Sequence, residues 1–310
     1  MTTAAPPSPA RSTSVPPQAH HWGTDALLVL MALIWGVNFI VVKVGTRLMT
    51  PLAFNGARVV IAAVVLSVVA AAMRERWPAR GDVLRLLVLG VLGNGLYQVF
   101  FIEGIARTRA GTAALVLAAA PAFMAIIGRL LGVERVTRRK VIGIAASLLG
   151  MALVVFGSAK SAEGATGDVA TLGGNMLVLT ACLCWSAYTV LLKPYTERVS
   201  GIPLSAVTMI GGAIPLLAVS SVEIARTPWP SLPAGAWGAL LYSGLLALGL
   251  AYLFWYRGVR VLGPTRTGMY SNLQPVVALI VAWLVLGETP TIVQIFGAVA
   301  IMAGILLTRT

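Results

Sequence analysis

The sequence predicts an all-α integral membrane protein, with ten transmembrane helices arranged as two inverted five-helix repeats around a central cavity. The chain has 310 residues, of which 58% are hydrophobic and 11% are charged, whereas a soluble domain typically carries about 25% charged residues. Ten apolar runs are long enough to cross the membrane as helices, each of which needs roughly 20 residues. The third observation is an internal duplication.

The duplication shows as glycine, proline, phenylalanine and glutamate positions that recur across the two halves. An offset of 154 residues pairs Gly95 with Gly249, Phe100 with Phe254, Gly104 with Gly258, Pro121 with Pro275, Glu134 with Glu288, Gly143 with Gly297, and Gly150 with Gly304. Upstream the offset is 150, and the stretch that begins at Trp35 aligns with the one at Trp185. Five helices are an odd number, so the second copy enters the membrane from the opposite side, as alternating access requires.

The elements follow in order. Residues 1–24 are rich in proline with little to bury, which predicts a disordered cytoplasmic tail. The first repeat is 25–158, with spans at 26–44, 52–73, 83–104, 110–131 and 139–157. An extracytoplasmic linker, 159–172, joins it to the second repeat, 173–310, with spans at 173–192, 203–223, 235–256, 266–286 and 291–308. The first run lacks the flanks of a secretory signal and is interpreted as a retained helix.

Lysine and arginine placement predicts the orientation, because basic residues accumulate in cytoplasmic loops. Most of them fall in loops on the side of the N-terminus, so both termini should be cytoplasmic. The formal charge of +13 is explained by this topology and by attraction to anionic lipid, with no nucleic-acid partner needed. The richness in alanine, valine and arginine indicates a bacterial source, which makes the membrane the cytoplasmic (inner) one.

Polar and aromatic side chains at helical spacing mark the faces that should line the cavity, because polar groups are costly against lipid. In the third span Asn94, Tyr97 and Gln98 share one face. The same reasoning, applied to the repeat partners and to the ninth span, gives the candidate substrate-cavity residues: Trp35, Asn38, Asn94, Tyr97, Gln98, Trp185, Tyr188, Tyr252, Tyr270 and Gln274. Interfacial belts and bonds between neighbouring helices are the alternative interpretation.

Proline and glycine positions carry separate expectations. Pro121 and Pro275 each lack an N–H, which frees a backbone carbonyl and predicts a hinge or kink, with ordinary tolerance of proline in a packed bundle as the alternative. Small residues in the fifth and tenth spans form strips that permit close helix approach, within one chain or between the protomers of a homo-oligomer. These strips contain Gly143, Ser147, Gly150, Gly297 and Gly304.

Charged residues are scarce inside the spans. No Asp, Glu or His lies near a span centre, which favours passive transport over a proton relay. Lys43 and Lys193 lie at helix ends, where snorkelling to the interface is the ordinary interpretation and a gate cation the alternative. Arg58 is the only deep cation, and either a substrate carboxylate or loop carbonyls would account for it.

The duplicated motifs resemble the drug/metabolite transporter superfamily, and within it the EamA-type exporters, over about residues 26–308. The resemblance depends on the stretch WGVNFIVVK from Trp35, the stretch from Pro51 to Arg58, the two proline-bearing helices, and Leu286-Gly287-Glu288 with Gln294 and Gly297. It implies ten helices, a central cavity and passage of small metabolites, and amino-acid exporters of the YddG kind look like the nearest relatives. In the first half, Gly132-Val133-Glu134 departs from the Gly-Glu pair by one residue.

The predicted lining of amides, hydroxyls and aromatic rings suits neutral or zwitterionic solutes, and amino acids fit best. We therefore expect a facilitative exporter of aromatic or neutral amino acids. An uptake carrier for another small metabolite and a non-transporting scaffold or lipid-handling protein stay open. No enzyme motif is present, so we expect no catalysis, metal or cofactor, and Cys182 and Cys184 are interpreted as packing residues.

Overall fold

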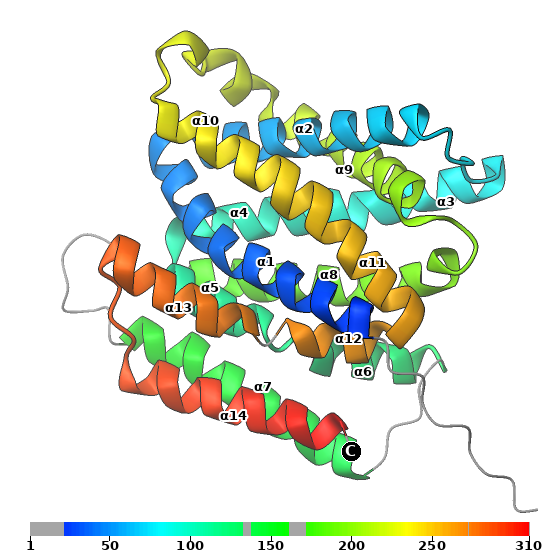
Figure 1. The fold of residues 1–310 in the computed structure, drawn as a ribbon. Helices are drawn as coiled ribbons and strands as arrows, with labels where there is room; N and C mark the ends of the chain where they lie inside the picture. The colour runs from blue at the N-terminus through cyan, green and yellow to red at the C-terminus, as the bar shows by residue number, and fades with distance from the viewer. Residues whose placement is uncertain (1–21, 133–137, 161–171, 272, 310) are drawn as a thin grey trace, which may run out of the picture.

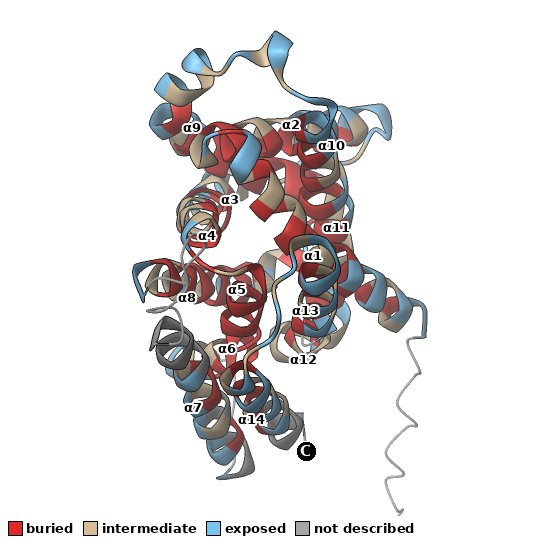
Figure 2. Ribbon diagram, turned by 90° about the vertical axis from the view of Figure 1, so that its left-hand side faces the viewer, coloured by how far each residue is buried: buried red, intermediate tan, exposed pale blue. Residues whose placement is uncertain are grey.

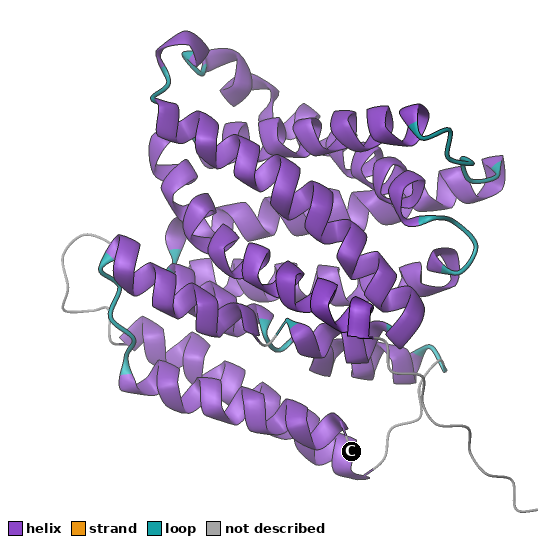
Figure 3. Cartoon of the chain, in the orientation of Figure 1, coloured by secondary structure: helices purple, strands orange, loops and turns teal. Residues whose placement is uncertain are grey.

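The computed structural model describes residues 22–132, 138–160, 172–271 and 273–309, and every regular element among them is a helix (Figure 3). The first half comprises α1 (Trp22–Leu48), α2 (Pro51–Ala72), α3 (Arg80–Gly90), η1 (Val91–Leu96), α4 (Tyr97–Arg107), α5 (Ala110–Leu117), α6 (Ala120–Leu130) and α7 (Arg138–Lys160). The second half comprises α8 (Leu172–Thr196), α9 (Gly201–Arg226), η2 (Trp229–Ser231), α10 (Ala234–Leu241), η3 (Tyr242–Leu250), α11 (Ala251–Leu262), α12 (Pro264–Tyr270), α13 (Leu273–Leu286) and α14 (Ile292–Arg309).

By length and composition, eight helical stretches of the described chain can cross a membrane. Two shorter apolar stretches, Val141–Leu153 in α7 and Ile292–Gly304 in α14, accompany them. The predicted spans fall on these helices, but several of the spans are shorter than the helices: α1 begins at Trp22 and α8 continues to Thr196. The reason is that helices extend beyond the hydrocarbon core through polar residues, which an apolar window does not detect.

Several predictions fall outside the described residues. These are most of the tail 1–24, most of the linker 159–172, and Glu134. The part of the tail that is described, from Trp22, is helical and belongs to α1.

The helices lie side by side and bury their inner faces against one another (Figures 1 and 2). The pair α7 and α14 forms one edge of the molecule, and much of its outer face is exposed (Figure 2). A Cβ atom at Gly150 would lie 2.8 Å from the carbonyl oxygen of Gly297, so the glycine strip packs these two helices within one chain.

Helical regularity is interrupted at corresponding places in both halves. The π-helical segments η1 and η3 overlap when shifted by 154 residues. Likewise α5 ends at Leu117 just before Pro121, and α12 ends at Tyr270 just before Pro275. Because proline has no N–H to donate, the ladder is broken there, and the predicted kink is in fact a break between two helices.

A pair of close contacts recurs with the two halves exchanged. A Cβ atom at Gly104 in α4 would lie 2.6 Å from Val178 in α8, and one at Gly258 in α11 would lie 2.8 Å from Leu28 in α1. Gly104 corresponds to Gly258 by the offset of 154 residues, and Leu28 corresponds to Val178 by the offset of 150. The third helix of each repeat therefore packs against the first helix of the other.

A second exchanged pair lies deeper. A Cβ atom at Gly90 would lie 2.2 Å from the carbonyl oxygen of Thr208 in α9, and one at Gly244 would lie 3.1 Å from that of Arg58 in α2. By the same two offsets, Gly90 corresponds to Gly244 and Arg58 corresponds to Thr208. Arg58 and Thr208 thus occupy equivalent backbone positions with different side chains.

Candidate functional site

A cavity lies between the two halves, with about 540 Å³ of space not filled by atoms, a figure that includes open solvent at its mouth. Its lining comes from helices of both repeats and includes both helix breaks. The lining residues are Trp35, Asn38, Phe39, Arg58, Tyr97, Gln98, Phe101, Leu117, Ala120, Trp185, Leu248, Tyr252, Ser271 and Gln274.

Aromatic rings form one wall of the cavity. The ring centroid of Trp35 lies 5.7 Å from that of Trp185 and 5.7 Å from that of Tyr252, with the rings nearly perpendicular in both pairs. The centroids of Trp185 and Tyr252 are 5.5 Å apart, which closes the triangle. Such edge-to-face contacts hold the rings in fixed positions, and their faces can receive apolar groups or a cation.

The indole of Trp35 is held from behind by a backbone bond. Its Nε1–H donates to the carbonyl oxygen of Ala247 at 2.8 Å. Ala247 lies in the π-helical segment η3, where the wider turn disturbs the regular backbone ladder. The π-helical segment η3, in the eighth predicted span, therefore positions the Trp35 ring of the first predicted span.

Arg58 supplies the positive charge of the cavity and is 0% exposed. Its Nε–H donates to Asn55 Oδ1 at 2.9 Å, Nη1 to Ser243 Oγ at 2.8 Å, and Nη2 to Gln98 Oε1 at 2.7 Å. The guanidinium also lies 5.6 Å from the ring centroid of Phe101. All three acceptors are neutral side chains, so loop carbonyls, one of the two predicted partners, do not bind it.

The polar network continues from Arg58 to the first helix. Ser243 Oγ–H donates to Asn38 Oδ1 at 2.7 Å, and Asn55 Nδ2 donates to the carbonyl oxygen of Gln98 at 2.9 Å. Helices α1 and α2, the segment η3 and the start of α4 are thereby joined around one buried cation. Hydrogen bonds of this kind hold the amides in one orientation toward the cavity.

The two helix breaks form another side of the lining. Leu117 and Ala120 flank the first break, and Ser271 and Gln274 flank the second. Equivalent contacts lie behind the two breaks, each between one half and the other. Ser186 Oγ–H in the second half donates to the carbonyl oxygen of Ala120 at 3.3 Å. In the first half, a Cβ atom at Gly36 would lie 3.2 Å from the carbonyl oxygen of Gln274.

Seven of the ten predicted cavity residues line this space, namely Trp35, Asn38, Tyr97, Gln98, Trp185, Tyr252 and Gln274. Asn94, Tyr188 and Tyr270 do not. Asn94 is displaced because it lies within η1, and the extra residue of a π-helical turn rotates the preceding face away from that of Gln98. Tyr270 lies at the end of α12, and its hydroxyl donates to Asp25 Oδ1 at the start of α1.

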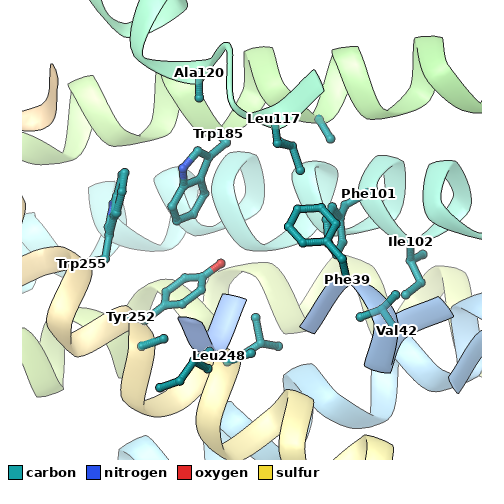
Figure 4. Close-up of a cluster of buried hydrophobic side chains, with 14 of the residues drawn as sticks. Phe39, Val42, Phe101, Ile102, Leu117, Ala120, Trp185, Leu248, Tyr252 and Trp255 are labelled. Atoms are coloured by element: carbon teal, nitrogen blue, oxygen red, sulfur yellow. The ribbon is translucent and has the colours of Figure 1, made fainter. Parts of the chain in front are cut away.

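Tyr188 lies beyond the cavity on α8. Its side chain is 0% exposed and its hydroxyl lies 2.6 Å from that of Tyr256 on α11. Gly93 permits this placement, because a Cβ atom there would lie 2.2 Å from the Tyr188 ring. Figure 4 shows Trp255 at this end, Val42 and Ile102 at the other end, and Trp185, Tyr252, Phe39 and Phe101 between them.

Sequence reasoning left several lining residues out of the candidate set. Arg58 was considered but left with two roles. Leu248 was missed because only polar and aromatic side chains were selected, although it lies one α-helical turn before Tyr252. Phe39, Leu117, Ala120 and Ser271 carry no signal beyond their positions beside Asn38, Pro121 and Gln274.

The burial and contacts of Lys43 differ from those expected of a lysine side chain that snorkels to the membrane interface. It is 5% exposed, and its Nζ donates to the carbonyl oxygens of Ile105 at 3.3 Å and Thr108 at 2.9 Å. It therefore binds the carboxyl end of α4, where the helix dipole favours a cation. Its repeat equivalent Lys193 pairs with Glu197 and donates to the carbonyl oxygen of Arg260 at 3.4 Å.

Glu288 joins the same corner from the second half. Gly287, with φ of 69°, turns the chain after α13, and the Glu288 carboxylate accepts hydrogen bonds from the backbone N–H groups of Ala110 and Gly111 at the start of α5. Burial raises the pKa of Glu288, while Lys43 and the two N–H groups lower it by a smaller amount.

Gln294 fixes the neighbouring helix start. Its side-chain oxygen accepts from the backbone N–H of Thr291 at 2.8 Å, and its own N–H donates to Thr291 Oγ1 at 3.2 Å, which makes a capping box. Its Nε2 donates to Thr112 Oγ1 of α5 at 2.8 Å.

Within the described residues, no group of three or more His, Cys, Asp or Glu side chains could hold a metal ion.

Comparisons with known proteins place these features among membrane transporters. The model of the EamA-like transporter family matches residues 22–156 and again residues 172–310. The chain is 27% identical over 293 residues to "Uncharacterized transporter YyaM" of Bacillus subtilis, covering 92% of this chain and 93% of that protein. It is 27% identical to a "Probable terminal-alkyne amino-acid exporter" of Streptantibioticus cattleyicolor, covering 90% of this chain and 91% of the relative.

It is also 28% identical to a "Probable amino-acid metabolite efflux pump" of Salmonella typhimurium, covering 90% of this chain and 92% of the relative. A solved structure titled "Crystal structure of protein" is similar in fold, with a TM-score of 0.67 at 18% identity over 93% of this chain and 98% of the other.

Proposed function

Because the chain belongs to the EamA-like transporter family, we propose that it is a facilitative carrier that moves neutral and aromatic amino acids out of the cytoplasm. The observation that carries the proposal is the cavity between the repeats, whose lining combines six aromatic rings with a buried arginine and three amides. Aromatic faces bind apolar groups and ammonium ions, and the N–H groups of amides and of a guanidinium donate hydrogen bonds to carboxylates. The names of two relatives, an amino-acid exporter and an amino-acid metabolite efflux pump, favour the same substrates and direction.

The mechanism we propose is alternating access between two inverted five-helix repeats, with ten membrane crossings. The exchanged contacts of Gly104 with Val178 and Gly258 with Leu28 support it, because each half packs on the other through equivalent residues. In this scheme α7 and α14 cross the membrane as the fifth and tenth spans. The repeats are 25–158 and 173–310, and the breaks before Pro121 and Pro275 act as hinges.

Both termini lie in the cytoplasm and the membrane is the inner membrane of a bacterium, as the placement of basic residues favours. Single cysteines introduced into a background without Cys182 and Cys184 test this. Thr50→Cys, between α1 and α2, should react with a membrane-impermeant reagent added outside the cell, and Arg76→Cys, between α2 and α3, should not. The reverse pattern would invert the topology.

Coupling to protons is not part of the proposal. Of the described residues that line the cavity, only Arg58 is charged at neutral pH, and none is a carboxylate or an imidazole that could exchange a proton there. The solute gradient alone therefore drives net flux.

The experiment is uptake of radiolabelled aromatic and neutral amino acids into liposomes that contain the purified protein, with and without an imposed proton gradient. Saturable uptake driven by the amino-acid gradient alone is expected. Strict dependence on the proton gradient would overturn facilitative transport, and no uptake of any amino acid would overturn the substrate class. Faster accumulation inside cells that express the protein would favour an uptake carrier, and binding of lipid without flux would favour a lipid-handling role.

A further inference from the structure

We infer that Arg58 binds the carboxylate of the transported solute, so that the carrier requires a carboxylate and rejects the corresponding amide or amine. The inference rests on the proposed transport of amino acids and specifies which part of the molecule is recognised and where.

The first argument is the charge of Arg58. The side chain is 0% exposed, and its three hydrogen-bond acceptors are a hydroxyl and two amide oxygens. Within the part of the chain that the structure describes, no Asp or Glu forms an ion pair with Arg58 and none lines the cavity. A buried cation without a counter-ion is unfavourable, and a bound anion would neutralise it.

The second argument is the number of donors. A guanidinium has five N–H groups, one on Nε and two on each terminal nitrogen. Arg58 uses the Nε hydrogen and donates once from each terminal nitrogen. One N–H on Nη1 and one on Nη2 are left for a further acceptor, and a carboxylate oxygen can accept from either of them.

The third argument is access to the ligand space. Arg58 lines the cavity together with Asn38 and Gln98, whose oxygens are directed into the network by Ser243 and by Arg58 itself. The acceptors that surround the guanidinium hold it in one position, so its remaining donors are oriented before a ligand arrives. Phe54 and Phe101, with ring centroids 5.7 and 5.6 Å from the guanidinium carbon, limit its movement further.

The fourth argument is the size of the anion. Among the described residues that line the cavity there is one arginine, and the others carry aromatic, amide, hydroxyl or aliphatic side chains. This suits a monoanion, whereas a phosphate commonly recruits several cationic or backbone donors. The carboxylate at Arg58 leaves the rest of an amino acid to the rings of Trp35, Trp185 and Tyr252, which accept an ammonium ion or an apolar side chain.

The test separates binding from flux. For the amino acid that the wild-type protein binds best, four ligands are compared: the amino acid, its amide, its decarboxylated amine and its deaminated acid. Binding is measured by calorimetry on the purified protein, and flux by uptake into liposomes. The amide and the amine should bind at least about tenfold more weakly than the amino acid, the loss expected for charge-assisted hydrogen bonds to a buried cation. The deaminated acid should keep most of the affinity.

Two variants add an independent readout. Arg58→Gln should lose the preference for the amino acid over its amide. Arg58→Lys should keep part of this preference, since lysine retains the positive charge but lacks the paired N–H donors of a guanidinium. Arg85→Gln is the matched control, because Arg85 is exposed and far from the cavity lining, and it should keep the full preference. Size-exclusion profiles show which variants fold, and the ligand comparison on the wild-type protein needs no variant.

Equal binding of acid and amide to the wild-type protein would overturn the inference, as would an unchanged preference in a folded Arg58→Gln. Absence of binding by every amino acid tested would overturn it as well. Binding that depends on the carboxylate but produces no flux would support this inference while overturning the proposed transport.

Discussion

The hydroxyl groups of Tyr188 and Tyr256 lie 2.6 Å apart and join α8 to α11 at one end of the cavity. Both side chains are almost completely buried, and neither lines the cavity. The equivalent residues in the other half, Asn38 and Ile102, form no such bond. The second half therefore has a polar contact at this end of the cavity that the first half lacks.

Tyr256→Phe removes one hydroxyl and should favour opening at this end. A net contribution of about 0.5–1.5 kcal/mol per hydrogen bond corresponds to a rise of roughly 2- to 12-fold in the open population. Hydrogen–deuterium exchange should increase in the adjoining turns of α8 and α11. Tyr195→Phe is the control, since Tyr195 contacts Arg198 through its ring face. Unchanged exchange in Tyr256→Phe would show that the bond does not hold the passage shut.

Gly104→Ala and Gly258→Ala should both lower thermal stability, because each added Cβ enters a close contact between the halves. Overpacking costs about 1–3 kcal/mol. Gly104→Ala should be the more damaging, since its Cβ also meets the backbone of Val178 at 3.0 Å and of Gly174 at 3.1 Å. Melting of detergent-purified protein, followed by size exclusion, measures the effect.

The control for this pair is Gly238→Ala in α10, where nothing lies within 4 Å of an added Cβ. Alanine there should be neutral or stabilise by up to about 1 kcal/mol, the difference in helix propensity. Equal melting temperatures for Gly104→Ala and Gly238→Ala would contradict the close packing of α4 on α8.

Glu288 should make stability depend on pH in a defined direction. Its pKa in the folded protein is raised above its usual value by burial, so between the two values the folded state binds more protons than the unfolded state. Stability should therefore fall as the pH rises from about 4.5 through the raised pKa. Glu288→Gln should flatten this slope in thermal melts, while the amide oxygen still accepts from Ala110 and Gly111.

Glu197→Gln provides the opposite case. Lys193 lowers the pKa of Glu197. The contribution of Glu197 to the free energy of unfolding is therefore present above the usual pKa of a glutamate and is lost as the pH falls. The change should be small because the side chain is exposed. A slope that Glu288→Gln leaves untouched would assign the pH dependence to another group.

Trp35→Phe should weaken solute binding without removing the preference for a carboxylate. The substitution deletes the bond from Nε1 to Ala247 and leaves that carbonyl without its partner, while it also shortens a wall of the cavity. A rise in KM of about 3- to 10-fold is expected from the loss of one hydrogen bond and some contact area. A greater loss for the amino acid than for its amide would place the carboxylate at Trp35 instead of Arg58.

The sequence predicted the helical class and the duplication because apolar length and repeated glycines are direct physical requirements of such a fold. Trp35, Gln98 and Trp185, which the sequence predicts as substrate-cavity residues, lie in the cavity lining, and their contact with a solute stays a prediction. Asn94 lies outside that lining because it belongs to a π-helical segment, which has no clear sequence signal and changes the face of the residues before it. Lys43 was misjudged because its partners, the carbonyls of α4, come from a distant helix end that local pattern does not reveal.

Arg58 and Thr208 occupy equivalent places in the two repeats, and only one of them carries charge. A second arginine at position 208 would put two like charges in the same interior, which is costly at low dielectric. After duplication, therefore, the backbone could keep its twofold relationship while the chemistry of the site became one-sided. A solute that carries one acidic and one apolar end then meets a directional pocket, and it is held in a single orientation whichever side of the membrane it entered from.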